Sequence, residues 1–154
     1  RYRRKKNKVP IVSIVGYTNS GKSTLFNFLT KSETLVKNML FATLDSSIRK
    51  CHLNNNNIIL IDTVGFIRDL PTHLIAAFKS TLDEIISSDL ILHVRDISEN
   101  EREIHASAVL KVLNELGVKN NDSRIIEVFN KIDLIKNDLF FEFFSMKEKK
   151  VKMK

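Results

Sequence analysis

Hydrophobic and polar positions along the chain alternate between two patterns, one typical of buried strands and the other of amphipathic helices. Short apolar runs rich in β-branched residues predict strands, and apolar residues spaced three or four apart predict helices. Strands are expected at residues 9–15, 46–53, 58–62, 90–94 and 124–129, and helices from residue 25, over 72–87 and from 98 to 116. This order predicts an α/β fold with a mostly parallel sheet, one antiparallel edge hairpin and helices on both faces. In such sheets, ligands bind at the carboxyl ends of the strands.

Local signals indicate where two of these elements begin and end. Four consecutive asparagines, residues 54–57, separate two expected strands, and Asn tolerates the left-handed backbone that a hairpin turn requires. Residues 98–101, Ser-Glu-Asn-Glu, have the form of a capping box, which predicts that a helix begins there. Gly117 is expected to end that helix, because glycine adopts the left-handed conformation without strain.

Residues 16–23 spell G-x-x-x-x-G-K-S, the sequence of a phosphate-binding loop. A predicted strand precedes the loop and a predicted helix follows it, which is the context that the motif requires. Glycines let backbone N–H groups converge on phosphate oxygens, and a helix N-terminus adds partial positive charge. Lys22 is expected to reach the β- and γ-phosphates, and the Ser23 hydroxyl to bind Mg²⁺. The residues expected to bind the nucleotide here are Asn19, Ser20, Gly21, Lys22, Ser23 and Thr24.

Asp62 and Gly65 form a D-x-x-G motif at the end of an apolar run, 39 residues beyond Ser23. An Asp at that place holds Mg²⁺ through water in phosphate-loop nucleotidases, and the glycine N–H can be presented to a γ-phosphate. Thr43 lies between the first helix and the hairpin, where a switch loop donates a Thr hydroxyl to Mg²⁺. The expected catalytic residues are therefore Lys22, Thr43 and Gly65, and the expected metal ligands are Ser23, Thr43 and Asp62.

Asn130-Lys131-Ile132-Asp133 follows the last predicted strand and matches N-K-x-D, the guanine-reading motif of GTPases. The Asp133 carboxylate would accept hydrogen bonds from guanine N1 and N2, a donor pattern that adenine does not present. Asn130 would brace the loop and contact the base, and the stem of Lys131 would cover the face of the base. Because a wrong base would leave a buried acceptor unpaired, GTP and GDP are expected over adenine nucleotides.

Charge divides the chain into a mildly acidic centre and two basic ends. The net charge is +7, of which residues 1–8 carry +6 and residues 145–154 carry +4, leaving −3 for the centre. We expect a basic linker at residues 1–8, a nucleotide-binding domain at 9–146 and a lysine-rich tail at 147–154. The basic ends suit contact with RNA phosphates, and they suit equally well a role as solubilising flanks.

Composition places the chain among soluble globular proteins. Hydrophobic residues make up 43% and charged residues 28% of 154 residues, which is enough for one domain with a sizeable core. No apolar run approaches the roughly 20 residues that a membrane span needs. Cys51 is the only cysteine, so no disulfide framework is expected and a reducing, cytoplasmic compartment is the simplest one. We also expect a monomer.

The motifs and the residues between them resemble the G domain of the HflX family, in the Obg–HflX branch of translation-associated GTPases. The resemblance covers residues 1–133, and residues 62–71, D-T-V-G-F-I-R-D-L-P, are close to diagnostic of the family. It implies a Ras-like P-loop G domain that hydrolyses GTP with Mg²⁺. It also implies a partner, the large ribosomal subunit, and a role in splitting stalled ribosomes. The family's N-terminal region is not in the sequence, so we expect an excised G domain.

Two positions suggest hypotheses about turnover. Phe66 stands where Ras-type enzymes carry a water-orienting Gln, so either intrinsic hydrolysis is slow or Phe66 simply packs against the 72–87 helix. Asn19 stands where related potassium-activated GTPases carry an ion-binding Asn, so K⁺ is a candidate cofactor. The alternative is that Asn19 only stabilises the loop.

The chain departs from the family after Asp133. Ser145 begins a degenerate S-A-K element whose backbone would contact guanine O6, but the glycine and the fuller helix that accompany it in the family are not evident. Two other functions stay open. One is a GTPase switch of tRNA modification or ribosome assembly, and the other is a regulatory nucleotide-binding module with feeble turnover.

Overall fold

The computed structural model describes residues 9–31, 47–69, 71–136, 138–139, 141 and 145. Three sequence expectations lie outside this part of the chain: the role of Thr43, the basic linker at residues 1–8 and the lysine-rich tail at residues 147–154.

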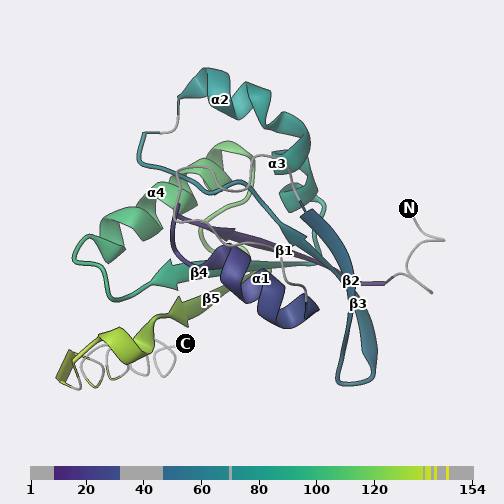
Figure 1. The fold of residues 1–154 in the computed structure, drawn as a ribbon. Helices are drawn as coiled ribbons and strands as arrows, with labels where there is room; N and C mark the ends of the chain where they lie inside the picture. The colour runs from purple at the N-terminus through teal and green to yellow at the C-terminus, as the bar shows by residue number, and fades with distance from the viewer. Residues whose placement is uncertain are drawn as a thin grey trace.

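A five-stranded sheet forms the centre of the described residues, with the order β2-β3-β1-β4-β5 (Figure 1). Neighbouring strands are parallel except for β2 and β3, which form an antiparallel hairpin at one edge. This arrangement confirms the predicted sheet. The strands are β1 Ile11–Gly16, β2 Ser47–Leu53, β3 Asn56–Asp62, β4 Leu90–Asp96 and β5 Ile125–Asn130.

The hairpin turn is tighter than the four asparagines suggested. Only Asn54 and Asn55 form the turn, with φ of 47° and 64°, and the next two asparagines already belong to β3. Two consecutive left-handed residues match the twist of the flanking strands, and Asn is among the few residue types that tolerate both positions.

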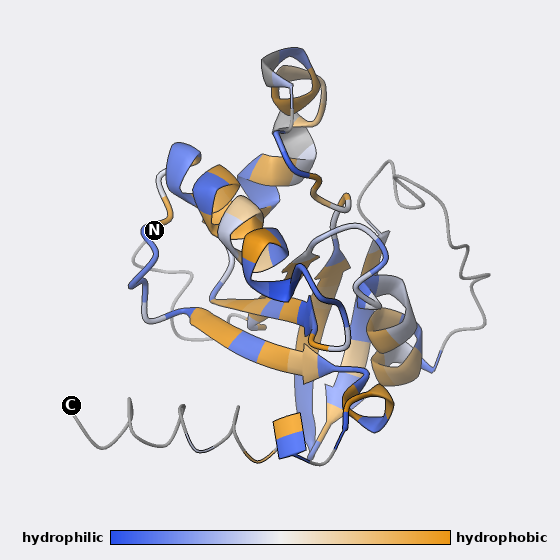
Figure 2. Ribbon diagram, turned by 90° about the vertical axis from the view of Figure 1, so that its left-hand side faces the viewer, coloured by the Kyte–Doolittle hydropathy of each residue, from blue (hydrophilic) through white to orange (hydrophobic). Residues whose placement is uncertain are grey.

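Helices cover both faces of the sheet, as predicted (Figure 1). Helix α1, Lys22–Thr30, lies on one face, where Phe26 shares a buried cluster with Val12 and Ile14 of β1. Helices α3, Lys79–Ile86, and α4, Arg102–Glu115, lie on the other face with Val15. Successive residues of β1 thus point to opposite faces and join two separate cores. Hydrophobic and hydrophilic residues alternate along the helices, as amphipathic packing requires (Figure 2).

The helix predicted over residues 72–87 is interrupted at Phe78. The structure has α2, Thr72–Ala77, followed by α3, and Phe78 between them has φ −96° and ψ 14°. The Phe78 side chain is partly buried against the core of α3 and α4. Apolar spacing continues across the break, so the sequence pattern alone could not reveal it.

The capping box predicted at residues 98–101 is wrong. Helix α4 begins at Arg102, and its N-cap residue, Glu101, makes no side-chain cap bond. The Ser98 hydroxyl donates instead to Asp96 Oδ1, at 2.5 Å. At the other end the prediction is confirmed, because Gly117 has φ 94° and Val118 N–H donates to Leu113 O as in a Schellman motif.

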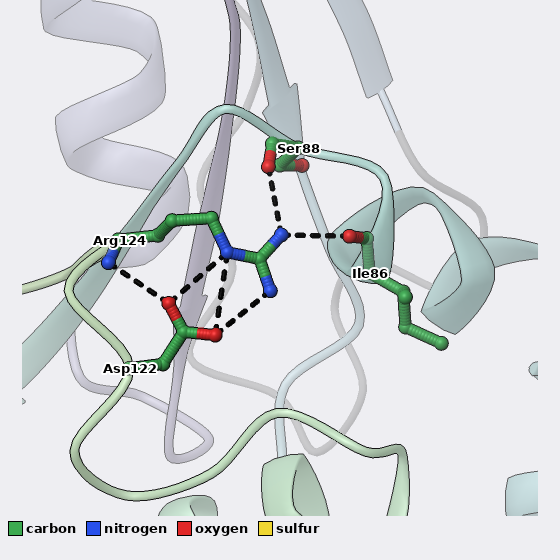
Figure 3. A network of polar contacts seen from close by, with 4 residues as sticks. All are labelled: Ile86, Ser88, Asp122 and Arg124. Atoms are coloured by element: carbon green, nitrogen blue, oxygen red, sulfur yellow. Dashed lines mark hydrogen bonds and ion pairs between the residues drawn. The ribbon is translucent and has the colours of Figure 1, made fainter. Parts of the chain in front are cut away.

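At the end of the sheet opposite the carboxyl ends, Arg124 joins β5 to α3 (Figure 3). Its guanidinium donates to the Ile86 and Ser88 carbonyls at 2.7 and 2.9 Å and pairs with Asp122 at 3.0 Å. These bonds from Arg124 hold the pKa of Asp122 below its usual value.

In the described residues, none of the helices is long and apolar enough to cross a membrane.

Candidate nucleotide-binding site

The phosphate loop lies at the carboxyl end of β1, the central strand of the sheet. β1 ends at Gly16 and α1 begins at Lys22, so the loop runs directly into a helix N-terminus. The first turn of α1 contains no acidic residue and receives no side-chain cap bond. Its backbone N–H groups and partial positive charge are therefore available to an anion.

At two positions of the loop, neighbouring atoms lie so close to the backbone that only glycine fits. A Cβ on Gly21 would lie 2.1 Å from Asn130 Nδ2, and the residue has φ 96°. A Cβ on Gly16 would lie 2.6 Å from Ser20 Oγ and 2.7 Å from the Val94 carbonyl. The loop is thus packed against β4 and against the guanine motif, and only glycine fits at these points.

Lys22, Ser23 and Asp62 converge beneath the loop. Lys22 is only 7% exposed, and its Nζ lies 3.7 Å from Asp62 Oδ1. Ser23 Oγ donates to Asp62 Oδ2 at 2.9 Å, so two residues predicted as metal ligands are in contact. Burial lowers the pKa of Lys22, and the neighbouring Asp62 only partly offsets this effect. A desolvated ammonium gains from a further anion, which the phosphates of a nucleotide supply.

These side chains suit a hard cation as well. A hydroxyl and a carboxylate provide oxygen ligands, which Mg²⁺ prefers in nucleotide sites. Ser20 Oγ is buried and has no hydrogen-bond partner within the described residues, so the loop retains polar capacity toward a ligand or water. The described residues contain no cluster of three His, Cys, Asp or Glu side chains that would hold a metal elsewhere.

Hydrogen bonds join the guanine motif directly to the phosphate loop. Asn130 Nδ2 donates to the Ser20 carbonyl at 3.0 Å, and Lys131 Nζ donates to the Asn19 carbonyl at 3.1 Å. Asn19 and Lys131 both have left-handed backbones, with φ of 60° and 61°. The structure therefore brings together the two motifs that the sequence assigned to base and phosphates, although about 110 residues separate them.

The D-x-x-G segment is paired with the phosphate loop through its backbone. Phe66 N–H donates to the Gly16 carbonyl at 3.0 Å, and Thr18 N–H donates to the Phe66 carbonyl at 2.6 Å. A Cβ on Gly65 would lie 3.2 Å from Thr18 Cα, so a larger residue would push the two segments apart. Gly65 thus lies next to the loop, and its predicted contact with a γ-phosphate stays a prediction.

The Phe66 side chain faces the core and not the phosphates. It is 0% exposed and belongs to the cluster that contains Leu82 and Ile85 of α3. Of the two hypotheses drawn from the sequence, packing against the helix describes this geometry. A Gln at this position with the same orientation would not reach a water molecule at the phosphates.

The sequence did not reveal the contacts of Tyr17. Its ring stacks on His105 of α4, with centroids 3.8 Å apart and an angle of 3° between the planes. Its hydroxyl accepts a hydrogen bond from Arg68 N–H at 2.9 Å. Tyr17 is one of the variable positions of the loop motif, and nothing in its spacing pointed to either partner.

The remaining predicted residues lie at the margins of the site. Thr24 is exposed on α1, and Asp133 is exposed in a short 3₁₀ turn, Ile132–Leu134. Ser145 is helical and exposed, and its hydroxyl donates to the Phe141 carbonyl at 2.6 Å, which is a local helical bond. The roles predicted for these three residues stay predictions.

A phosphate loop with a guanine motif bonded to it, at the carboxyl edge of a mixed five-stranded sheet, defines a G domain of the P-loop class. A family model described as 50S ribosome-binding GTPase matches residues 11–131. The chain belongs to this family.

Individual relatives agree with this assignment. GTPase HflX of Flavobacterium psychrophilum is 55% identical over 126 residues, which are 82% of this chain and 30% of that protein. This match confirms the resemblance to the HflX G domain. The chain therefore spans about a third of the length of the HflX proteins that it matches.

Solved structures agree as well. A GTP-binding protein of Sulfolobus solfataricus in complex with GDP is 36% identical, with a TM-score of 0.66 over 85% of this chain and 39% of that one. Era in complex with MgGDPNP and a segment of 16S ribosomal RNA is 26% identical, with a TM-score of 0.71 over 93% of this chain and 47% of that one. The Ras-like fold is confirmed by these neighbours.

Proposed function

We propose that this domain binds GTP and hydrolyses it to GDP and phosphate. The observation that carries the proposal is the pair of hydrogen bonds from Asn130 and Lys131 to the Ser20 and Asn19 carbonyls. They join the segment expected to read the base to the segment expected to bind the phosphates, as binding of a single nucleotide would require. The relatives named GTPase HflX and the neighbour in complex with GDP support the same nucleotide.

The roles proposed for Lys22, Ser23, Asp62 and Gly65 agree with their positions at the loop, and those of the other residues rest on the motifs. The buried Lys22 ammonium would neutralise the β- and γ-phosphates, and the Gly65 N–H would bond the γ-phosphate. Asp133 would select guanine, and Thr24 and the Ser145 backbone would complete the contacts. Ser23 and Asp62, together with Thr43, would hold Mg²⁺, which neutralises charge that develops on the phosphates.

We propose that turnover by the isolated domain is slow. Hydrolysis joins a water oxygen to the γ-phosphorus and breaks its bond to the β–γ bridging oxygen, so the water must be held in line. Phe66 is buried and its side chain cannot hold that water. A partner or the residues of the switch loop would then orient it. K⁺ at Asn19 is a further candidate, and equal rates in matched KCl and NaCl would exclude it.

For the whole protein, we propose a GTPase that binds the large ribosomal subunit and splits ribosomes. The family description, 50S ribosome-binding GTPase, supports the partner. The splitting role is what the resemblance to the HflX family implies. Within that protein, residues 9–146 would be the G domain between a basic linker and a lysine-rich tail, acting as a monomer in the cytoplasm. A role in tRNA modification or ribosome assembly is the alternative.

The first experiment measures hydrolysis of GTP and ATP by this chain, with and without purified large ribosomal subunits. We expect this chain to hydrolyse GTP but not ATP. We also expect the large subunits to accelerate GTP turnover at least tenfold. Binding of GTP without stimulated turnover would favour the regulatory module, and ATP hydrolysis would overturn the proposal. Sedimentation of intact ribosomes with the full-length protein then separates splitting from the alternative roles.

A further inference from the structure

The carboxylate of Asp96 lies at the point where β4, the guanine motif and the phosphate loop meet. Asp96 is the last residue of β4 and is in register with Asn130, the last residue of β5. Lys131 follows directly with a left-handed backbone, φ 61°, and its Nζ lies 2.7 Å from Asp96 Oδ2.

The two oxygens of Asp96 have different partners. Oδ1 accepts from the Ser98 N–H at 3.0 Å and from the Ser98 hydroxyl at 2.5 Å. Oδ2 faces Lys131, and the side chain of Asp96 is 7% exposed against 34% for Lys131. Burial alone would raise the pKa of Asp96, but bonds from Lys131 and Ser98 and the charge of Lys131 hold that pKa below its usual value. The carboxylate is therefore ionised at neutral pH.

Lys131 also connects to the phosphate loop, because the same Nζ donates to the Asn19 carbonyl at 3.1 Å. A lysine stem has several rotatable bonds and loses rotamer freedom when it is held. One end of Lys131 is anchored here by a charge-assisted bond to a buried carboxylate, so this cost is met before a nucleotide arrives.

We propose that Asp96 is a positioning residue for nucleotide binding: it holds Lys131 extended over the base site and against the phosphate loop. The inference rests on the proposed function and deepens it, because it adds a residue outside the known motifs to the guanine site. Loss of the anchor leaves Lys131 mobile, so a bound nucleotide is released faster.

The different partners of the two oxygens make a selective variant available. In Asp96→Asn, the retained oxygen can still accept from Ser98, while an amide N–H₂ faces Lys131 and cannot accept from it. Ser98→Ala is the matched control, because it removes a hydroxyl bond to the same carboxylate and leaves the contact with Lys131. Asp96→Glu keeps the charge and tests rescue.

The experiment measures release of a fluorescent GDP from the 154-residue chain by stopped flow, with melting curves to verify folding. We expect D96N to accelerate release of GDP about tenfold, because one charge-assisted bond is lost. We expect S98A to accelerate release less than threefold. D96E, which keeps the charge, should reverse at least half of the acceleration that D96N produces. In a Lys131→Met background, D96N should add less than twofold, because its target is gone.

The outcomes separate this inference from the function on which it rests. Binding of GDP by the unaltered chain with unchanged release from D96N overturns the role of Asp96 alone. Equal acceleration by D96N in both backgrounds also overturns it, because the carboxylate would then act through the Ser98 turn. Failure of the unaltered chain to bind GDP overturns the proposed function and this inference together. If D96N does not fold, the result for D96E decides. Release of GDP from a folded D96E more than fivefold faster than from the unaltered chain contradicts the anchoring.

Discussion

The hydroxyl of Tyr17, in the phosphate loop, accepts a hydrogen bond from the backbone N–H of Arg68, at 2.9 Å. Arg68 lies three residues beyond Gly65, so this bond fastens the segment after the D-x-x-G motif to the loop. The Tyr17 ring is held in turn by stacking on His105 of α4. One side chain thus joins the phosphate loop, the segment that would sense the γ-phosphate and a helix on the outer layer.

Tyr17→Phe removes only the hydroxyl and is expected to weaken binding of a non-hydrolysable GTP analogue about threefold more than binding of GDP. The reason is that Gly65 would contact only the γ-phosphate, which GDP lacks. Titration calorimetry with both nucleotides measures the ratio. His105→Phe, which keeps a stacked ring, is the control and should leave the ratio unchanged. Equal weakening of both nucleotides by Tyr17→Phe would contradict this coupling.

The buried pair of Lys22 and Asp62 is expected to reduce the stability of the nucleotide-free domain. Burial lowers the pKa of Lys22 from 10.5, so the charged form costs stability below the folded pKa, and this cost declines as pH rises above the folded pKa toward 10.5. Replacing a buried ion pair by neutral groups is often neutral or stabilising, whereas removing one partner leaves an uncompensated charge.

We therefore expect Lys22→Met/Asp62→Asn to melt a few degrees above the unaltered chain and Lys22→Met alone to melt below it. Both variants should lose the rise in melting temperature that GDP and Mg²⁺ produce in the unaltered chain. Scanning calorimetry with and without nucleotide gives all of these values. A double variant that melts well below the unaltered chain would show that the pair stabilises the fold.

Phe66→Gln is expected to destabilise the domain without accelerating hydrolysis. Phe66 is fully buried in the cluster of α3 and α4, so the substitution buries an amide and leaves a void, at a cost of about 3 kcal/mol. Phe66→Leu, which stays apolar, should cost about 1 kcal/mol and is the matched control. Urea unfolding and single-turnover hydrolysis are measured side by side. Unchanged stability with tenfold faster hydrolysis would mean that the Gln reaches the nucleotide.

Asp122 is expected to contribute stability that disappears in acid. The hydrogen bonds from Arg124 hold its pKa below 3.8, so its contribution is full above that value and is lost as pH falls through the lower, folded pKa. Asp122→Asn should therefore lower the melting temperature at pH 7. Below pH 4, the difference in melting temperature between this variant and the unaltered chain should become smaller. Melting curves from pH 2.5 to 7 test this, with Asp83→Asn on an exposed helix face as control. A constant difference at every pH would disprove the linkage.

Much of the site followed from contiguous residues. The loop at residues 16–23 and the guanine motif at 130–133 are short segments whose chemistry depends on residue type and spacing, so each was recognisable on its own. Their meeting was also predictable, because the carboxyl ends of parallel strands share one edge of the sheet. Helix ends were less predictable: Ser98 was assigned to a cap, but its hydroxyl has a better acceptor in Asp96, which is charged and lies two residues away.

The sequence by itself determined the class of fold, the nucleotide and the residues of its motifs, because periodicity and motif spacing are properties of a local stretch of chain. Only the tertiary structure decided that Phe66 points into the core, that Tyr17 bonds Arg68 and that Asp96 holds Lys131. Those relationships depend on which residues of distant segments come within about 3 Å and on the direction of each side chain. Packing of helices against the sheet sets both, and it is a property of the whole chain.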